Sequence, residues 1–305
     1  MPALTVQLFG KFCVRRHNSK TNAIDASKLQ ELLSYLLVYR ETPHARETLA
    51  TLLWGETSTM QSKKYLRQAL WQLQSALDSR DEDSNKRVFE VDADWVSISP
   101  DADISVDVEI FERAFAGARD ISGQTMDSSQ ADKLETAVQL YHGDFLEGSY
   151  QDWCLCERER LQTILLMMLD KLMNYCAAHE MYETAVAHGM RVLHYDRARE
   201  CTHRRLMRLH SMAGDRTAAL RQYDHCVTAL NEELGVNPSR LTVNLYNQIR
   251  LDEPLNQSPA THRDNSNVLP GIADHLQHMR QALLRIREQV QKDIKAVEEA
   301  LDEWK

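Results

Sequence analysis

The first hundred residues contain two segments in which apolar and polar residues alternate or β-branched residues gather. Residues 4–9 and 12–14 surround a Gly-Lys pair, and residues 88–91 and 95–98 surround an Asp-Ala-Asp turn. A two-residue hydrophobic period on both sides of turn-forming residues is typical of a β-hairpin. The pattern therefore predicts one hairpin near each end of this region.

Between these hairpins the hydrophobic period becomes helical, and three helices are expected. The first opens at Ser27 and Gln30, a capping box whose two side chains can each satisfy a backbone N–H of the first turn. Thr42-Pro43 favours the start of a short second helix. Ser58 and Gln61 form a second capping box, which predicts the start of the third helix.

The third helix is predicted to be amphipathic. Its buried stripe, at the spacing i, i+4, i+7 and i+11, consists of Leu66, Leu70, Leu73 and Leu77. Its outer face and flanks, which carry no acidic residue, consist of Gln61, Lys63, Lys64, Arg67, Gln68, Trp71 and Ser75. Such a face is often merely solvated, so it does not by itself establish a binding surface. Trp71 can contact a ligand or pack on the second hairpin, and packing against Val88 or Trp95 is the favoured interpretation.

Residues 101–250 are helical in pattern throughout and contain an internal repeat. Tyr182-Glu183-Thr184-Ala185-Val186 and Arg216-Thr217-Ala218-Ala219-Leu220 lie 34 residues apart. That period belongs to tetratricopeptide helix pairs, in which small residues let two helices approach closely. We therefore expect a short tetratricopeptide-like superhelix.

The end of the chain combines a linker pattern with a heptad pattern. Residues 251–271 contain three prolines among polar residues, a composition that cannot bury enough surface to order itself. From Ile272 to Trp304, ten apolar residues recur at alternating spacings of four and three, with one stutter. Such a narrow stripe suits a two-helix contact. Homotypic pairing is favoured, and folding back onto the repeats is the alternative.

Composition and charge limit the classes of protein to which the chain can belong. Only 10 glycines and 7 prolines occur in 305 residues, which disfavours an all-β fold and a glycine-rich nucleotide site. The net charge is −9, but residues 1–100 hold 13 Lys or Arg against 12 Asp or Glu. A surface for nucleic acid must therefore be local to this first third. The absence of a long apolar run or a signal-peptide pattern predicts a cytoplasmic protein with reduced thiols and no membrane partner.

Motifs spread over the first 250 residues resemble one known family. In the first hundred residues these motifs are Leu8-Phe9-Gly10, Leu32-Leu33-Ser34-Tyr35-Leu36, Leu52-Leu53-Trp54-Gly55-Glu56 and Leu66-Arg67-Gln68-Ala69-Leu70. Later come Val106 to Phe111, Leu140 to Gly148, Trp153 to Arg160, Gly214 to Leu220 and Leu234 to Ser239. In this order and spacing they are similar to the Streptomyces antibiotic regulatory protein (SARP) family of bacterial transcriptional activators.

The resemblance implies an α+β winged helix-turn-helix of the OmpR type, followed by an all-α tetratricopeptide-like activator domain. The resemblance does not extend to the heptad pattern, which on its own adds a C-terminal coiled-coil helix to the expected fold class. The expected domains are the winged helix at 1–100, the activator domain at 101–250, a linker at 251–271 and a coiled-coil or dimerisation helix at 272–305. The activator domain is implied to support the DNA-binding half, to mediate homodimer contacts and to engage RNA polymerase.

A winged helix places the N-terminal half of its third helix in the major groove, so the basic face gains a function. The residues expected to enter the groove first are Gln61, Lys64, Arg67 and Gln68, with Lys63 on a flank. Gln68 could read adenine, and Arg67 could read guanine or bind phosphate. Lys86 and Arg87 would lie along the neighbouring backbone as a wing that positions the protein. The expected partners are promoter double-stranded DNA and RNA polymerase.

Other classes are less well supported. Cys154 and Cys156 could hold a soft metal with His142 or His179, but structural zinc sites use wider spacings and a second pair. No catalytic motif appears, so we expect neither an enzyme nor a cofactor. The competing hypothesis is a tetratricopeptide-type adaptor without DNA binding. It is motivated by Gln74, where the family often has arginine, and by the nearly neutral first third.

Overall fold

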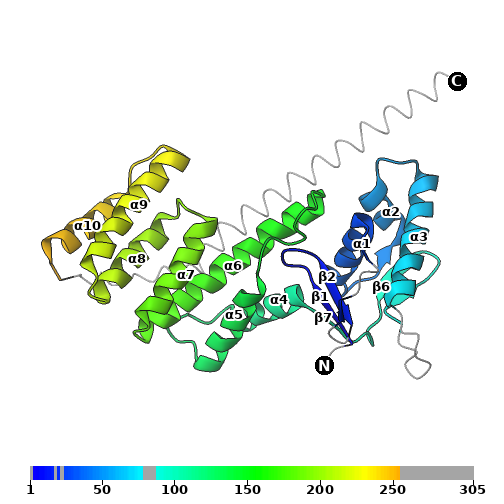
Figure 1. Ribbon diagram of the computed structural model, residues 1–305, viewed down its shortest axis with the longest axis horizontal. Coiled ribbons are helices and arrows are strands. Elements are labelled where there is room, and N and C mark those ends of the chain that lie inside the picture. Colours follow the sequence, from blue (N-terminus) through cyan, green and yellow to red (C-terminus); the bar gives the residue numbers. More distant parts are fainter. Residues whose placement is uncertain (1–2, 17–18, 21–23, 78–86, 255–305) are drawn as a thin grey trace, which may run out of the picture. The chain divides into compact units, whose positions relative to one another are not determined.

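The computed structural model describes residues 3–16, 19–20, 24–77 and 87–254 (Figure 1). The described residues up to Arg250 form one compact unit. The predicted heptad helix and all but the first four residues of the predicted linker lie outside the described residues. In the described part, the named strands all precede residue 107 and helices alone follow, so the predicted order of a mixed region and an all-helical region is confirmed.

The strands form two sheets. The first has the order β3-β2-β1-β7, with β1 antiparallel to β2 and parallel to β7. The second has the order β4-β6-β5 and is antiparallel throughout. Their bounds are β1 Leu4–Gln7, β2 Cys13–Arg16, β3 Ser19–Lys20, β4 His44–Ala45, β5 Phe89–Val91, β6 Trp95–Ile98 and β7 Ile104–Val106. Both predicted hairpins are confirmed, as β1-β2 and β5-β6.

Three strands were not predicted: the two-residue β3, which extends the first hairpin, and the more distant β4 and β7. Residues 104–106 were expected to be helical, but they form β7, in which Val106 pairs with Val6. Thr42-Pro43 was expected to open the second helix, but His44–Ala45 forms β4 and α2 begins at Arg46. Each segment is too short to show a period, and each pairs with a strand far away in the sequence. Tertiary contacts therefore decide their conformation.

Three helices lie in the N-terminal region: α1 Ser27–Val38, α2 Arg46–Trp54 and α3 Thr59–Leu77. Neither predicted capping box forms. Ser27 lies inside α1, after the N-cap Ala26, and the Gln30 side chain donates to the carbonyl of Ile24. At α3 the helix begins just after Ser58 as expected, but the Gln61 amide donates to the Tyr65 hydroxyl.

The all-helical region continues through α4 Asp107–Ala118, α5 Ser128–Leu140, α6 Asp152–Ala178, α7 Tyr182–Tyr195, α8 Glu200–Met212, α9 Arg216–Leu234 and α10 Arg240–Leu251. The residues that define the 34-residue repeat occupy equivalent places, since Tyr182 begins α7 and Arg216 begins α9. Ala185 and Ala219 are both fully buried. Helices α6 to α9 pack in consecutive pairs along the chain (Figure 1).

A buried aspartate joins the mixed region to the helical region. Asp107, the first residue of α4, accepts hydrogen bonds from the backbone N–H groups of Leu8, Phe9 and Val108 at 2.8–3.0 Å. Burial raises the pKa of the Asp107 carboxyl, and these N–H donors offset part of that effect. The carboxylate therefore ties the end of β1 to the start of α4.

The loop between α5 and α6 closes over the same junction. Phe9 packs on Phe111 and Tyr141, with ring centroids 5.1 and 4.7 Å apart. Gly10 has φ +74°, and a Cβ on Gly143 would lie 3.2 Å from the Gly10 Cα atom. Glycine is therefore needed at both Gly10 and Gly143, where the backbone after β1 meets the loop between α5 and α6.

A single arginine holds that loop from the side of α6. Arg158 donates hydrogen bonds of 2.6–2.8 Å to the carbonyls of Phe145, Leu146 and Ser149. Leu146 has a positive φ of 46°, a backbone conformation that a residue other than glycine adopts only at a cost in free energy. The guanidinium offsets this cost by satisfying three loop carbonyls.

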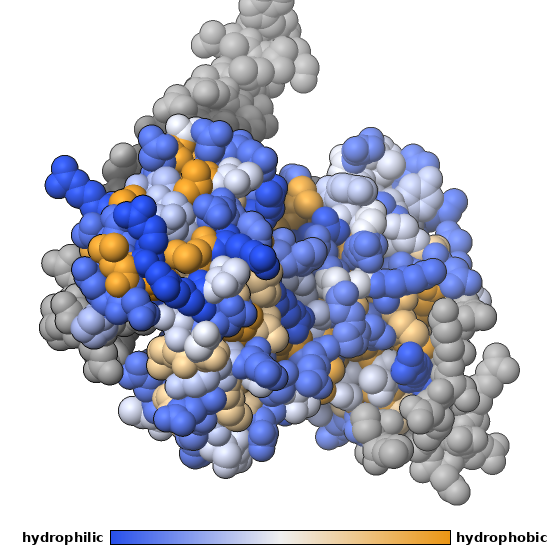
Figure 2. Space-filling model, turned by 60° about the vertical axis from the view of Figure 1, so that its left-hand side comes forward, coloured by the Kyte–Doolittle hydropathy of each residue, from blue (hydrophilic) through white to orange (hydrophobic). Residues whose placement is uncertain are grey.

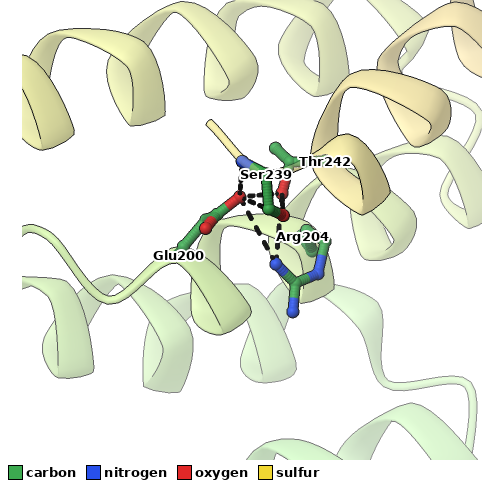
Figure 3. A network of polar contacts seen from close by, with 4 residues as sticks. All are labelled: Glu200, Arg204, Ser239 and Thr242. Atoms are coloured by element: carbon green, nitrogen blue, oxygen red, sulfur yellow. Dashed lines mark hydrogen bonds and ion pairs between the residues drawn. The ribbon is translucent and has the colours of Figure 1, made fainter. Parts of the chain in front are cut away.

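A polar network joins α8 to the start of α10 (Figure 3). Glu200 accepts hydrogen bonds from the Ser239 N–H and hydroxyl, both at 2.7 Å, and from the Thr242 hydroxyl. The Arg204 guanidinium lies 3.5 Å from the same carboxylate oxygen and donates to Thr242 at 3.1 Å. Burial raises the pKa of Glu200, but the hydrogen bonds and Arg204 outweigh it, and the pKa is lowered.

We expect Glu200→Gln to lower the free energy of unfolding by about 1–2 kcal/mol, because charge-assisted hydrogen bonds are lost. A carboxylate with a lowered folded pKa stabilises the fold above its unfolded pKa of about 4.3, and loses that effect as pH falls through the folded value. The stabilities of the two proteins in urea titrations should therefore converge as the pH falls through the lowered folded pKa of Glu200. Glu183→Gln, in the exposed first turn of α7, is the matched control and should change little. An equal loss in both variants would contradict the expectation.

Candidate nucleic-acid interface

The third helix has the amphipathic structure that its sequence predicts. Leu66, Leu70, Leu73 and Leu77 are all buried, and α3 packs on α1 and α2. At its C-terminal end, Arg16 of β2 donates a hydrogen bond to the Leu77 carbonyl. The exposed side chains on the other faces are Thr59, Met60, Gln61, Lys63, Lys64, Arg67, Gln68, Trp71, Gln72 and Ser75.

The exposed faces of α3 carry positive charge only, but not all of that charge is free. Lys63 forms an ion pair with Glu47 in the first turn of α2. The hydrogen bond and charge of Lys63 lower the pKa of Glu47. The structure describes no hydrogen bond or ion pair between another residue and the side chains of Lys64, Arg67 and Gln68. These three side chains are therefore available to a ligand.

A groove of about 700 Å³ lies between α3 and the β5-β6 hairpin. Arg46 fixes the hairpin against α2, since its backbone N–H donates to the backbone carbonyl of Asp94 and its guanidinium donates to the backbone carbonyl of Asp92, both at 2.9 Å. The groove is lined by Ala45, Arg46, Glu47, Thr48, Lys63, Leu66, Arg67, Ala93, Asp94 and Trp95. Arg67 therefore lies at the border between the outer face of α3 and this groove.

Of the two hairpin residues expected to act as a wing, the structure describes only one. Lys86 lies outside the described residues. Arg87 is exposed and precedes β5, whereas the turn at the other end of the hairpin carries Asp92 and Asp94. Because two carboxylates repel phosphate, only the Arg87 end of this hairpin suits a phosphate backbone.

The packing predicted for Trp71 is wrong. Its side chain is 67 % exposed, and that of Trp95 is 50 % exposed. The groove between α3 and the hairpin is lined by Leu66 and Arg67, and Trp71, one turn beyond Arg67, is not among its lining residues. Trp153 is buried between Tyr35 and Phe145, and Trp54 is half-buried with its ring 6.4 Å from that of Tyr65.

The two neighbouring cysteines considered as metal ligands do not converge. Cys154 is buried in α6, its thiol accepts a hydrogen bond from Ser149, and burial raises its pKa to about 11. Cys156 is exposed. Within the described ranges, no group of three or more His, Cys, Asp or Glu side chains could hold a metal ion. In the same ranges, no helix is long and apolar enough to cross a bilayer.

Sequence reasoning identified the exposed face of α3 but missed two features around it. The pair between Lys63 and Glu47 joins residues 16 positions apart on different helices, so no local spacing could show it. The groove likewise depends on β4, which was expected to be helical. Both features arise only when α2, α3 and the hairpin are assembled.

Comparisons with known proteins identify the helical region. Residues 106–250 match the bacterial transcriptional activator domain (BTAD). This match supports the assignment of the chain to the SARP-like family of transcriptional regulators. The resemblance carried by the sequence motifs is thereby confirmed, because the matched range contains the later motifs of that set.

One solved structure has a fold similar to that of this chain. It is described as "Mycobacterium tuberculosis EmbR in complex with low affinity phosphopeptide", and the two chains share a TM-score of 0.63 and 17 % sequence identity. The match covers 90 % of this chain and 72 % of that one. No curated protein sequence matches significantly.

Proposed function

We propose that this SARP-like regulator binds promoter double-stranded DNA, and that residues 1–100 act as a winged helix whose α3 enters the major groove. The observation that carries the proposal is the exposed, acid-free face of α3, on which Lys64, Arg67 and Gln68 have no partner among the described residues. A duplex presents one phosphate charge per about 1.7 Å, so a binder needs such unpaired cations together with polar groups that reach base edges.

The residues of α3 and the hairpin divide into positioning and reading groups. The positioning group consists of cations that suit phosphate oxygens, namely Lys63, Lys64, Lys86 and Arg87. Arg67, Gln68 and Gln61 carry the side-chain types that form bidentate contacts with guanine or adenine. The exposed Trp71 adds an apolar surface that suits a thymine methyl group.

The rest of the chain is proposed to act on transcription. The matched domain is an activator domain by description, and its helices form a tetratricopeptide-like scaffold that offers surface to RNA polymerase. The apolar heptads of residues 272–305 suit pairing of two copies as a homodimer. The regulator would act in the bacterial cytoplasm, where its promoter DNA is.

A mobility-shift experiment with genomic upstream fragments tests the proposal. We expect selective retention of particular fragments, with log affinity falling against log salt at about −0.9 per neutralised phosphate. Lys64→Ala should weaken binding to all fragments alike and reduce the salt slope by about 1. Lys133→Ala, which removes an exposed lysine of α5, is the control and should leave both quantities unchanged.

A flat salt response, or no selected fragment, would overturn DNA binding. If a pull-down from lysate then recovered proteins alone, the adaptor hypothesis would replace it. These two outcomes are distinct, because an adaptor has no reason to select upstream fragments.

The ion pair between Glu47 and Lys63 gives a second test of the same surface. We expect Glu47→Gln to strengthen DNA binding about two- to fivefold at low salt, because it frees Lys63 and removes a negative charge beside the groove. The gain should vanish at high salt. Affinity is measured by fluorescence anisotropy, with Glu90→Gln in β5 as a control for charge alone. Weaker binding by Glu47→Gln would show that this face of α3 points away from DNA.

A further inference from the structure

An arginine-rich face of α8 lies outside the DNA-binding region proposed above. Arg204, Arg205 and Arg208 follow at spacings that place them on one side of the helix. Arg205 pairs with Asp170 of α6 at 3.0 Å, while Arg204 contacts Thr242 of α10. This face of α8 therefore lies between two other helices, and Figure 3 shows its Arg204 end.

The positive charge on this face is not balanced by nearby acids. Arg199 also pairs with Asp170, at 2.6 Å, so Arg199, Arg204 and Arg205 share the two carboxylates of Asp170 and Glu200. Arg208 has no hydrogen bond or ion pair with any described residue, and burial together with Arg204 and Arg205 lowers its pKa. The local charge is thus about +2 in a chain of net charge −9.

This arrangement costs stability in the free protein, because like charges at these spacings repel. The arginines of the pairs are only 22–32 % exposed, so they are held in place rather than fully solvated. A preorganised group of guanidinium ions with spare donors suits bidentate carboxylates. Such a surface is therefore better explained by an anionic ligand than by folding.

We propose that the Arg204–Arg205–Arg208 face of α8 binds an acidic peptide segment of a partner protein. A face bounded by two helices suits a single extended or helical segment. Duplex DNA is disfavoured there, because Asp170 and Glu200 lie among the arginines and would repel a continuous phosphate backbone. On the side of the molecule drawn in Figure 2, hydrophilic side chains separate the apolar patches from one another.

The test uses the full chain and a rhodamine-labelled hexaglutamate peptide, followed by fluorescence anisotropy. We expect binding that weakens with salt, and no binding of labelled hexaglutamine. Arg208→Gln should weaken binding about fivefold or more, and Arg208→Lys should weaken it less, because lysine keeps the charge but loses the bidentate fork. Thermal unfolding should show that Arg208→Gln is at least as stable as the parent protein, because it removes repulsion.

Two matched variants locate the effect. Arg221→Gln removes an exposed arginine of α9, and Lys64→Gln removes an unpaired charge from α3. Both should bind hexaglutamate as the parent does, and Arg208→Gln should leave DNA affinity unchanged, which separates this site from the promoter-binding one. Equal weakening in all three variants would overturn the proposal as non-specific attraction. Displacement of the peptide by equimolar inorganic phosphate or duplex DNA would assign the face to those anions instead.

Discussion

Asp107→Ala is expected to lower the free energy of unfolding by about 3 kcal/mol or more, since it leaves buried N–H donors without an acceptor. The carboxylate receives three backbone N–H groups, from Leu8, Phe9 and Val108, and no other acceptor for them is present among the described residues. Removing it also relieves the cost of burying a charge, which the raised pKa reports, but the unpaired donors remain. The loss should appear as a lower urea midpoint in circular dichroism.

Asp103→Ala is the matched control for this substitution. Asp103 also accepts a backbone N–H, from Ala3 at 2.9 Å, but it is exposed, so water replaces it and the change should stay within about 0.5 kcal/mol. Asp107→Asn keeps the shape of the side chain but places an amide against N–H donors, and should also destabilise. Equal stability of Asp107→Ala and the parent protein would show that β1 and α4 are joined by packing alone.

The parts of the fold that sequence could predict are those set by local periodicity. The leucines of α3 are buried because a 3.6-residue period puts Leu66, Leu70, Leu73 and Leu77 on one face whatever that face meets. Ala185 and Ala219 are buried for a similar reason, since a repeated sequence makes repeated contacts. In the first case the information lies within a few helical turns, and in the second it lies in a repeat of 34 residues.

The parts that could not be predicted depend on residues far apart in the chain. β7 is a strand because residues 104–106 meet β1, about a hundred positions earlier, and three residues show no period of their own. The Ser27–Gln30 capping box fails because Gln30 finds the Ile24 carbonyl, a partner that only the folded loop supplies. The two capping-box patterns therefore predicted where α1 and α3 begin to within a residue, but not which hydrogen bonds their side chains make.

The same division applies to the candidate sites. The outward face of α3 follows from the leucine stripe, so its exposed residues could be named from sequence. The exposure of Trp71 could not, because it depends on which side of α3 the hairpin approaches. The arginine face of α8 was also missed, since Asp170 and Thr242, which bound it, come from helices 35 and 38 residues away.

Arg67→Ala and Gln68→Ala are expected to relax base preference at the positions they contact, by about 1–3 kcal/mol for each bidentate pair lost. Lys64→Ala differs in kind, because a phosphate contact carries no sequence information and its loss weakens all sites alike. The comparison is made on a selected fragment and on a series in which each base pair is changed in turn. Affinities are measured at one fixed salt concentration, since the phosphate contribution depends on it.

Arg67 and Gln68 are adjacent in sequence but point to different sides of α3, so they should affect different base pairs. Arg67 borders the groove beside the hairpin, and its variant should lose preference at the edge of the site nearest that hairpin. Gln68 lies closer to the middle of the exposed face, near Lys64 and Trp71 at spacings of four and three. A parent-like base preference in both variants, with intact folding by circular dichroism, would show that another surface reads the sequence and that α3 only positions the protein.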